Sequence, residues 1–119
     1  MCIRDSFLID EIELRPGALE DFLAAMDTGY RPGAEARGQR LVHTWVTPPT
    51  RTEGIPVSVM LVWQLDGVEG FWRMRSQNAA DDVVAWWREA ERYCVSRTRR
   101  YAASPAAVDR FEAFGRANA

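Results

Sequence analysis

The segment from residue 55 to residue 65 constrains the fold more than any other, because it has the pattern of a β-strand with two apolar faces. One face carries the alternating positions from Val57 to Leu65, and the other carries Met60 and Val62. An antiparallel strand with one face in water would alternate between apolar and polar residues. We therefore expect this strand to be covered on both sides.

Three further strands are predicted at residues 7–14, 41–47 and 93–102, where β-favouring residues are closely followed by a proline. Residues 48–56 hold three prolines and a glycine, a composition typical of a loop. This loop is expected to connect the second strand to the third.

Helical patterns fill the two long intervals between the strands. The first has apolar residues spaced by three and four positions, at Leu19, Phe22, Leu23, Met26 and Tyr30. Pro32-Gly33 interrupts that pattern, and one further helical turn is expected at residues 34–37. The second interval predicts a helix at residues 67–76 and then an apolar helical stripe made of Val83, Trp86, Trp87 and Ala90.

The predicted order is β-α-β-β-α-β, which is the order of the ferredoxin-like α+β fold with a four-stranded antiparallel sheet. Helices can cover only one face of that sheet. The other face would still carry apolar side chains, and monomers rarely expose a patch of several hundred Å². A second copy of the chain is the simplest cover, so we expect a homodimer.

A chain of 119 residues has room for one domain. We assign residues 7–102 to this domain and residues 103–119 to a C-terminal helical tail that begins at Ser104-Pro105. Residues 1–6 fit no predicted element, and we interpret them as a non-native leader. Cys2 and Cys94 belong to no CxxC pair and predict no disulfide framework.

Charge and hydropathy exclude several classes of partner. The net charge is −2 and there is no run of basic residues, so no nucleic acid is expected as a partner. No apolar stretch approaches the roughly 20 residues needed to span a bilayer, so no membrane association is expected. A cytoplasmic location follows as the default expectation.

The basic residues restrict the chemistry further. All 15 are arginine, and the absence of lysine excludes Schiff-base catalysis and a P-loop phosphate site. His43 is the only histidine, so one chain cannot assemble a metal site from two or three imidazoles. We therefore predict neither a metal nor a cofactor.

With this layout, residues 7–102 resemble the dimeric α/β-barrel superfamily, and within it the NIPSNAP-type proteins. The segments that carry the resemblance are Glu13–Gly17, Val62-Trp63, Phe71-Trp72, Trp86-Trp87 and Ser96–Arg100. The resemblance implies two sheets that close into a barrel between protomers, with a ligand cavity between sheet and helices. Superfamily activities include cofactor-independent monooxygenases, cyclases, isomerases and haem-degrading enzymes. Haem-degrading members share a first-strand Asn and a helical His, and this chain has neither.

His43 is the first candidate for catalysis, because only histidine titrates near neutral pH without help from its surroundings. It is expected to share a strand face with Leu41, Trp45 and Thr47. As a functional residue it would move a proton or donate a hydrogen bond to a ligand. The alternative is a structural histidine that is bonded within the barrel.

Aromatic side chains are candidates for ligand binding, because planar rings stack on flat ligands at little entropic cost. The predicted substrate-binding residues are Trp45, Trp63, Trp72 and Tyr30. Helical spacing instead favours a core position for Trp86 or Trp87. The alternative for the whole set is that the rings form only the core and the dimer seam.

Arg97 and Asp10 complete the catalytic candidates. Arg97 and Arg99 are expected on one face of the last strand, with Arg100 on the other. An arginine there could bind a carboxylate or a developing oxyanion, or simply pair with an acid such as Glu11. Asp10 would be a proton acceptor if its pKa were raised, or the partner of an arginine.

The sequence therefore predicts a small-molecule-binding homodimer whose ligand is an aromatic or alicyclic metabolite. If it is an enzyme, its chemistry is expected to be cofactor-independent monooxygenation, cyclisation or isomerisation. The alternative is a non-enzymatic binding or interaction protein of NIPSNAP type. Replacing His43 would separate the two, because only an enzyme would lose turnover while keeping its dimer.

Overall fold

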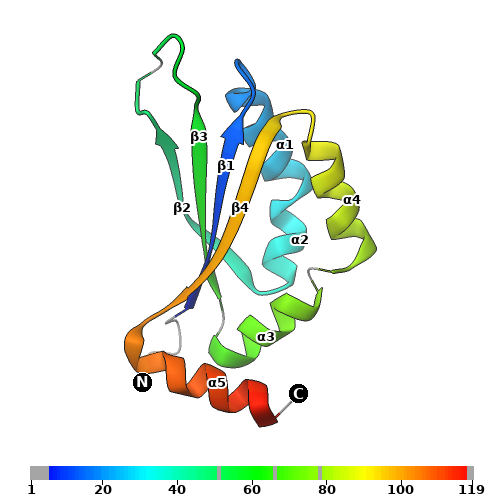
Figure 1. The fold of residues 1–119 in the computed structure, drawn as a ribbon. Coiled ribbons are helices and arrows are strands. Elements are labelled where there is room, and N and C mark those ends of the chain that lie inside the picture. The colour runs from blue at the N-terminus through cyan, green and yellow to red at the C-terminus, as the bar shows by residue number, and fades with distance from the viewer. Residues whose placement is uncertain (1–5, 51, 66, 78, 118–119) are drawn as a thin grey trace.

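The computed structural model describes residues 6–50, 52–65, 67–77 and 79–117. Its elements follow the predicted order and are drawn in Figure 1. They are β1 (Ser6–Leu14), α1 (Leu19–Gly29), α2 (Arg31–Ala36), β2 (Gln39–Thr47), β3 (Ser58–Leu65), α3 (Gly67–Gln77), α4 (Asp81–Ala90), β4 (Cys94–Ala103), the 3-10 turn η1 (Pro105–Ala107) and α5 (Val108–Ala117).

The strands form one antiparallel sheet in the order β2-β3-β1-β4. The two central strands are β1 and β3, and they pair along their whole length from Phe7 opposite Gln64 to Glu13 opposite Ser58. Helices α1, α2 and α4 lie along one face of this sheet, and α3 and α5 lie at one end (Figure 1). The predicted ferredoxin-like α+β fold is confirmed.

The helix-covered face of the sheet is dry in its centre. Leu8 and Ile12 of β1 are fully buried, as are Leu61 and Trp63 of β3. They pack against Phe22 and Met26 of α1, which belong to the predicted apolar stripe of that helix. Burying such side chains contributes roughly 1.5–3 kcal/mol each, which makes this layer the main source of stability.

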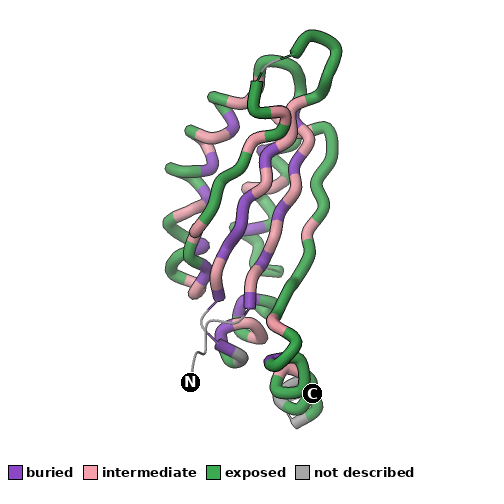
Figure 2. The backbone as a smooth tube through the Cα atoms, turned by 90° about the vertical axis from the view of Figure 1, so that its left-hand side faces the viewer, coloured by how far each residue is buried: buried purple, intermediate pink, exposed green. Residues whose placement is uncertain are grey.

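The opposite face of the sheet carries no helix. Figure 2 looks onto this face, with the strands in front and no helix crossing them. On the two central strands its apolar residues are Phe7, Ile9, Met60 and Val62, of which the first three are only partly buried and Val62 is 7% exposed. The strand predicted at residues 55–65 was expected to be covered on both faces. Within the described residues, helices cover only one of its faces. We call this surface the open face.

The edge strand β2 contains an irregularity that changes which residues share a face. Leu41 pairs with Trp63, but His43 pairs with Val62, so one extra residue is inserted at Val42. A β-bulge of this kind reverses the alternation of side chains beyond it. Leu41 lies on the helix-covered face and His43 lies on the open face. The prediction that His43 shares a face with Leu41 is wrong for this reason.

Helix α2 begins earlier than the sequence pattern suggested. Pro32 lies in its first turn, where the missing backbone N–H has no helical partner to lose. The interruption predicted at Pro32-Gly33 is therefore the start of a helix. Gly38 follows the helix with φ of 90°, a backbone conformation that favours glycine, and leads directly into β2.

The C-terminal segment packs against the end of the sheet through aromatic rings. The Phe71 ring of α3 lies 5.0 Å from the Phe111 ring of α5 and 5.4 Å from the Tyr101 ring of β4. Of the residues assigned to a leader, Ser6 is buried at the start of β1, and the others lie outside the described residues. No described helix is both long enough and apolar enough to cross a bilayer.

Candidate functional site

A groove of about 630 Å³ lies between the edge strand β4 and helix α4. It forms because β4 has a neighbouring strand on one side only, and α4 crosses the sheet beside it (Figure 1). Its lining residues come from the β1–α1 turn, α4 and β4: Arg15, Val83, Val84, Trp87, Arg88, Glu91, Cys94, Val95, Ser96, Arg97 and Arg99. A volume of this size suits a small organic ligand.

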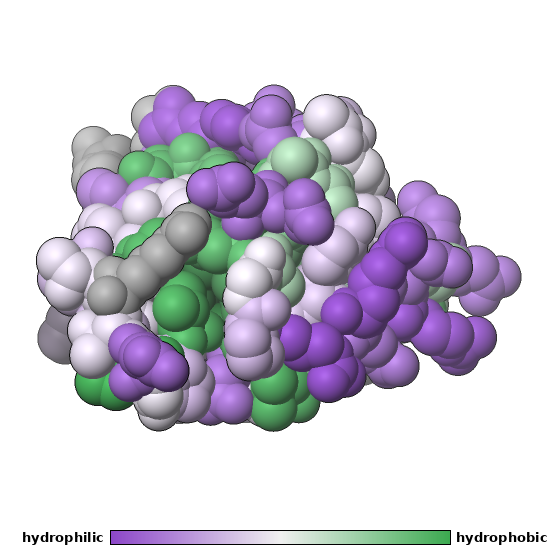
Figure 3. Space-filling view, turned by 90° about the horizontal axis from the view of Figure 1, so that it is seen from above, coloured by the Kyte–Doolittle hydropathy of each residue, from purple (hydrophilic) through white to green (hydrophobic). Residues whose placement is uncertain are grey.

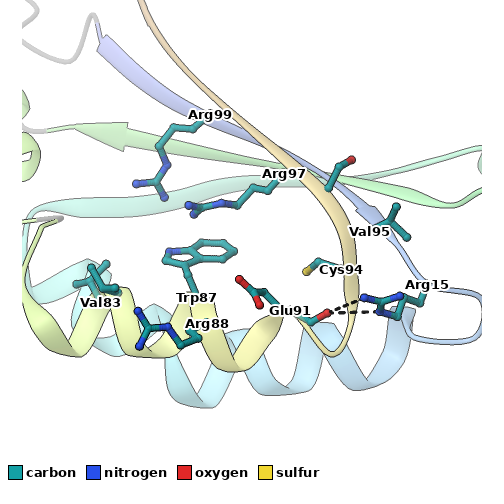
Figure 4. A pocket seen from close by; sticks show the side chains of 11 residues that line it. Arg15, Val83, Trp87, Arg88, Glu91, Cys94, Val95, Arg97 and Arg99 are labelled. Atoms are coloured by element: carbon teal, nitrogen blue, oxygen red, sulfur yellow. Dashed lines mark hydrogen bonds between the residues drawn. The ribbon is translucent and has the colours of Figure 1, made fainter.

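Arg97 and Trp87 form the middle of the groove. Figure 4 shows Arg97 extending from β4 over the Trp87 indole, which rises from α4. The central carbon of the Arg97 guanidinium is 3.7 Å from the Trp87 ring centroid, which is a close cation–π contact. The Arg97 side chain has neither a hydrogen bond nor an ion pair with another described residue.

The charge of Arg97 is costly where it lies. Its pKa is lowered, first because burial removes water from the guanidinium and next because the Arg99 charge repels it. The residue is still classed as exposed, so the groove is open to solvent at this point. Arginine stays protonated at neutral pH even when its pKa is lowered. Arg97 is therefore a cation that forms no ion pair with a described residue.

Arg99, two residues further along the same face, is paired with an acid. It donates to both carboxylate oxygens of Asp10, at 2.8 and 3.0 Å, and to the Tyr30 hydroxyl oxygen at 3.2 Å. Burial by itself lowers the pKa of Arg99, but the hydrogen bonds and charge of Asp10 outweigh burial and raise it. Of the two arrangements expected for Asp10, the structure shows the pair with an arginine.

Asp10 is an acceptor that has no free oxygen to offer a substrate. It is 0% exposed, and besides the two bonds from Arg99 it accepts one from Trp63 Nε1 at 3.2 Å. Both carboxylate oxygens of Asp10 are therefore used by neighbouring donors inside the fold. Asp10 is therefore placed to hold Arg99 in position behind the groove.

Arg15 and Cys94 lie together at one end of the groove (Figure 4). The Arg15 guanidinium donates to the Glu91 backbone oxygen at 3.3 and 3.4 Å, at the C-terminal end of α4 where cations are favoured (Figure 4). Cys94 is a free thiol on the same wall. Burial raises the pKa of the Cys94 thiol, although the charges of Arg97 and Arg15 oppose that rise.

His43 and Trp45 lie on the other side of the sheet from this groove. Both follow the β-bulge in β2, and they pair with Val62 and Met60 on the open face. Their rings are stacked with centroids 4.7 Å apart, and Trp45 is 52% exposed. Within one chain the structure does not bring His43 together with Arg97 or Asp10.

Tyr30 and Trp63 are core residues of the covered face. Their rings meet edge to face at 5.7 Å, and Tyr30 also contacts Trp86 and Trp87 at 5.0 and 5.1 Å. They stand behind the groove and hold Trp87 in place from the inside. Trp86 is fixed in turn by Gly29, where a Cβ atom would lie 2.7 Å from the Trp86 Nε1 atom.

Trp72 is found at the far end of the sheet from the groove. Its ring lies 5.2 Å from that of Phe71, and the Arg75 guanidinium lies 5.5 Å from the Trp72 ring and 5.6 Å from the Tyr101 ring. It belongs to the aromatic cluster that binds α5 to α3 and β4. Trp72 therefore has no contact with Arg97 or the groove.

Sequence reasoning missed Trp87, Arg15 and Glu91 as groove residues. Trp86 and Trp87 are adjacent in an amphipathic helix, so their side chains point in different directions. One of the two must therefore lie toward the edge of the covered layer. The spacing of α4 does carry this signal, since Val83, Trp87 and Glu91 recur at intervals of four. The spacing does not reveal which strand lies at the edge of the sheet, so the groove itself could not be predicted from it. Among the described residues no group of three His, Cys, Asp or Glu side chains could hold a metal ion.

The fold matches solved structures at low sequence identity. An uncharacterized NIPSNAP domain protein from Burkholderia xenovorans has a TM-score of 0.61 and 15% identity, over 85% of this chain and 95% of that one. A NIPSNAP family protein of unknown function from Agrobacterium tumefaciens has a TM-score of 0.63 and 10% identity, over 87% and 90%.

A third similar structure is described as an antibiotic biosynthesis monooxygenase. It comes from Nitrosomonas europaea and has a TM-score of 0.57 and 8% identity, over 88% of this chain and 94% of that one. Neither a protein-family model nor a curated protein sequence matches the chain. At these identities the likeness establishes a shared fold.

Proposed function

We propose that this chain, which has the fold of the NIPSNAP domain proteins, is a NIPSNAP-type small-molecule-binding protein that acts as a homodimer. The ligand would lie in the groove between α4 and β4. The observation that supports this most directly is the Arg97–Trp87 contact in a groove of about 630 Å³, because it offers an aromatic wall and an unpaired cation side by side.

The groove is a better candidate than the buried aromatic clusters because it is a hollow that is open to solvent. Tyr30 is 3% exposed and Trp63 0%, so neither can meet a ligand without unpacking the core. Val84 and Val95 at the groove are 44% and 55% exposed, which is unusual for valine. A bound ligand with an apolar body would cover both.

The binding test uses Cys94 as a reporter that lies in the groove wall. In a Cys2→Ser background, one-ring and two-ring aromatic and alicyclic compounds are screened for protection of Cys94 from iodoacetamide, and native mass spectrometry records any molecule that copurifies. At least one compound is expected to slow the reaction at saturating concentration. Val84→Trp fills the groove and is expected to abolish protection.

The matched control for Val84→Trp is Val108→Trp. Val108 is equally exposed, at 43%, but it begins α5 and does not line the groove. Both variants add the same volume to a surface valine, so a general effect on folding would appear in both. If no compound protects Cys94, or if the two variants behave alike, the groove is not the binding site.

A homodimer would cover the open face. Trp45 and Met60 lie side by side on it, and so do His43, Val62 and Ile9 in the next row across the strands. Figure 3 looks down on the end of the molecule that carries the β2–β3 loop, and at that end apolar side chains reach the surface between hydrophilic ones. Apolar side chains in neighbouring rows on an uncovered sheet face are typical of an interface between two copies.

Met60→Asp tests the dimer, because it puts a second carboxylate beside Glu11 and replaces the apolar neighbour of Trp45 on the open face. Light scattering is expected to give the mass of two chains for the unmodified protein and of one chain for the variant. Ala113→Asp adds the same charge to the exposed surface of α5 and should leave the dimer intact. A monomeric unmodified protein would contradict the proposed pairing.

A cofactor-independent enzyme is the second candidate, and the observation that favours it is the similar structure described as a monooxygenase. His43 would then act from the open face, where the interface between two copies would enclose it with Trp45. Oxygen uptake with 1,3-dihydroxynaphthalene, an electron-rich phenol, is the test. His43→Ala should abolish uptake and leave the dimer intact, whereas a binding protein shows no uptake in either form.

A further inference from the structure

The groove contains more positive charge than its protein surroundings neutralise. Four arginines line it against one carboxylate, that of Glu91. Asp10 neutralises Arg99 from behind, which leaves three arginines in the lining with the single carboxylate of Glu91. The chain as a whole has a net charge of −2, so this positive region is a local arrangement and does not follow from the composition.

The geometry of Arg97 is suited to an anion with two oxygen atoms. Because the guanidinium stacks on Trp87, its N–H groups extend sideways from the contact toward the space between α4 and β4 (Figure 4). None of them donates to a described residue. A planar guanidinium binds a carboxylate through two parallel N–H···O bonds, which is the strongest arrangement available to it.

The surroundings of Arg97 also specify what carries that anion. Three valines, Val83, Val84 and Val95, line the groove beside the arginine. The face of the Arg97 guanidinium away from Trp87 can stack on a flat ring. An inorganic anion would leave the valines in water, and a neutral ring would leave the Arg97 charge unpaired.

We infer that the ligand of the groove is an organic carboxylate on a flat apolar body, with its carboxylate bound by Arg97 and its ring seated against the valines. This inference rests on the proposed function, since it names the chemical class of ligand for the same groove. Arg99 does not bind the ligand in this arrangement. Held by Asp10, it adds positive charge behind Arg97 and keeps the site electropositive.

The test compares three probes that separate charge from shape. They are 2-naphthoate, its neutral isostere 2-naphthamide, and acetate, which has the carboxylate without the ring. Isothermal titration calorimetry at low ionic strength is expected to show 2-naphthoate binding about ten to a hundred times more tightly than 2-naphthamide, the range of a charge-assisted hydrogen-bonded pair. Acetate should bind more weakly than either.

The variant Arg97→Met is expected to remove the preference for 2-naphthoate and to leave the binding of 2-naphthamide nearly unchanged. Arg97→Lys keeps the charge but cannot form two parallel bonds, so it should retain part of the preference. Arg116→Met removes the same charge from α5, far from the groove, and should leave the preference intact. Urea unfolding of each variant confirms that it is folded.

The outcomes distinguish the inference from the proposed function. The inference is overturned if 2-naphthoate and 2-naphthamide bind equally, or if Arg97→Met keeps the preference for 2-naphthoate. In either case, protection of Cys94 by the neutral probe would still support the groove as a binding site. Failure of both naphthalene probes to bind also overturns the inference. Failure of every compound in the Cys94 screen would overturn the proposed function itself.

Discussion

The space between the sheet and the helices has two halves, and each contains an arginine in a different environment. In the closed half, Arg99 is enclosed with Asp10, Tyr30 and Trp63, and its hydrogen bonds are satisfied. In the groove half, Arg97 lies on Trp87 and forms no ion pair with any residue that the structure describes. The two arginines are two residues apart on one strand face.

The difference separates an arginine that stabilises the fold from one that is available to bind a ligand. A buried ion pair that loses one member leaves an uncompensated charge, which destabilises a protein far more than the intact pair stabilises it. Arg97 is exposed in the groove, so water hydrates part of its charge and the fold does not depend on a protein partner for it. Arg99 is therefore expected to matter for folding, and Arg97 for binding.

The largest effect is expected from breaking the closed half at Asp10. Asp10→Ala leaves the Arg99 charge and the Trp63 N–H without their acceptor, and should lower the free energy of unfolding by about 3–5 kcal/mol. Glu11→Ala breaks the exposed pair of Glu11 and Arg100 and should cost less than about 1 kcal/mol. Urea unfolding measures both, and equal losses would contradict the comparison.

A second measurement shows whether the cost at Asp10 comes from charge or from packing. The double variant Asp10→Leu with Arg99→Met removes both charges and keeps similar volumes. Replacement of a buried pair by apolar residues is often neutral, so the double variant should recover most of the lost stability. A double variant as unstable as Asp10→Ala would indicate that packing at Asp10 dominates.

A smaller loss is expected from displacing Trp86, which supports the closed half from α4. Gly29→Ala places a methyl group against the Trp86 indole and should cost about 1–3 kcal/mol, because a locked ring cannot move aside. Gly33→Ala in α2 meets only the Nη1 atom of Arg37, at 3.2 Å, and because alanine favours a helix it should be neutral or stabilising by about 0.5–1 kcal/mol. Thermal unfolding of the two variants should differ in direction.

A still smaller change is expected when the groove half loses its cation. Arg97→Met removes a cation–π contact but also removes an incompletely hydrated charge, so the free energy of unfolding should change by less than about 1 kcal/mol. Arg99→Met, two residues away, should be as damaging as Asp10→Ala. A large loss at Arg97 in urea unfolding would mean that it is a structural residue.

The smallest effect is expected on the pH dependence of the reaction of Cys94 with iodoacetamide. Burial raises the pKa of this thiol, so in a Cys2→Ser background its iodoacetamide rate should rise at a higher pH than that of an unfolded cysteine. The Arg97 charge opposes that rise, and Arg97→Met should therefore move the rate profile to still higher pH. A profile that Arg97→Met leaves unmoved would show that the Arg97 charge does not reach the thiol.

The same pKa shift has a consequence for stability. The folded thiol keeps its proton to a higher pH than the unfolded thiol does. The contribution of Cys94 is therefore fully present below the unfolded pKa and declines as pH rises toward the folded one. Cys94→Ser should make the unfolding free energy less sensitive to pH on the alkaline side.

The sequence by itself determined the element order, the sheet and the sidedness of most side chains. Residues in β1 and β4 alternate regularly, so the faces of Asp10, Arg97 and Arg99 were predicted correctly. The apolar stripe of α1 was equally readable, and its Phe22 and Met26 are buried. Periodicity is a local property of the backbone, which is why one chain's sequence is enough to read it.

Only the tertiary structure decided which side chains meet. One inserted residue at Val42 put His43 on the face opposite Leu41, and pattern alone cannot reveal a β-bulge. The placement of β4 at the sheet edge, next to α4, opened the groove and made Trp87 its wall. Register and packing depend on contacts between residues far apart in the chain, so the partner of each arginine was settled by the fold.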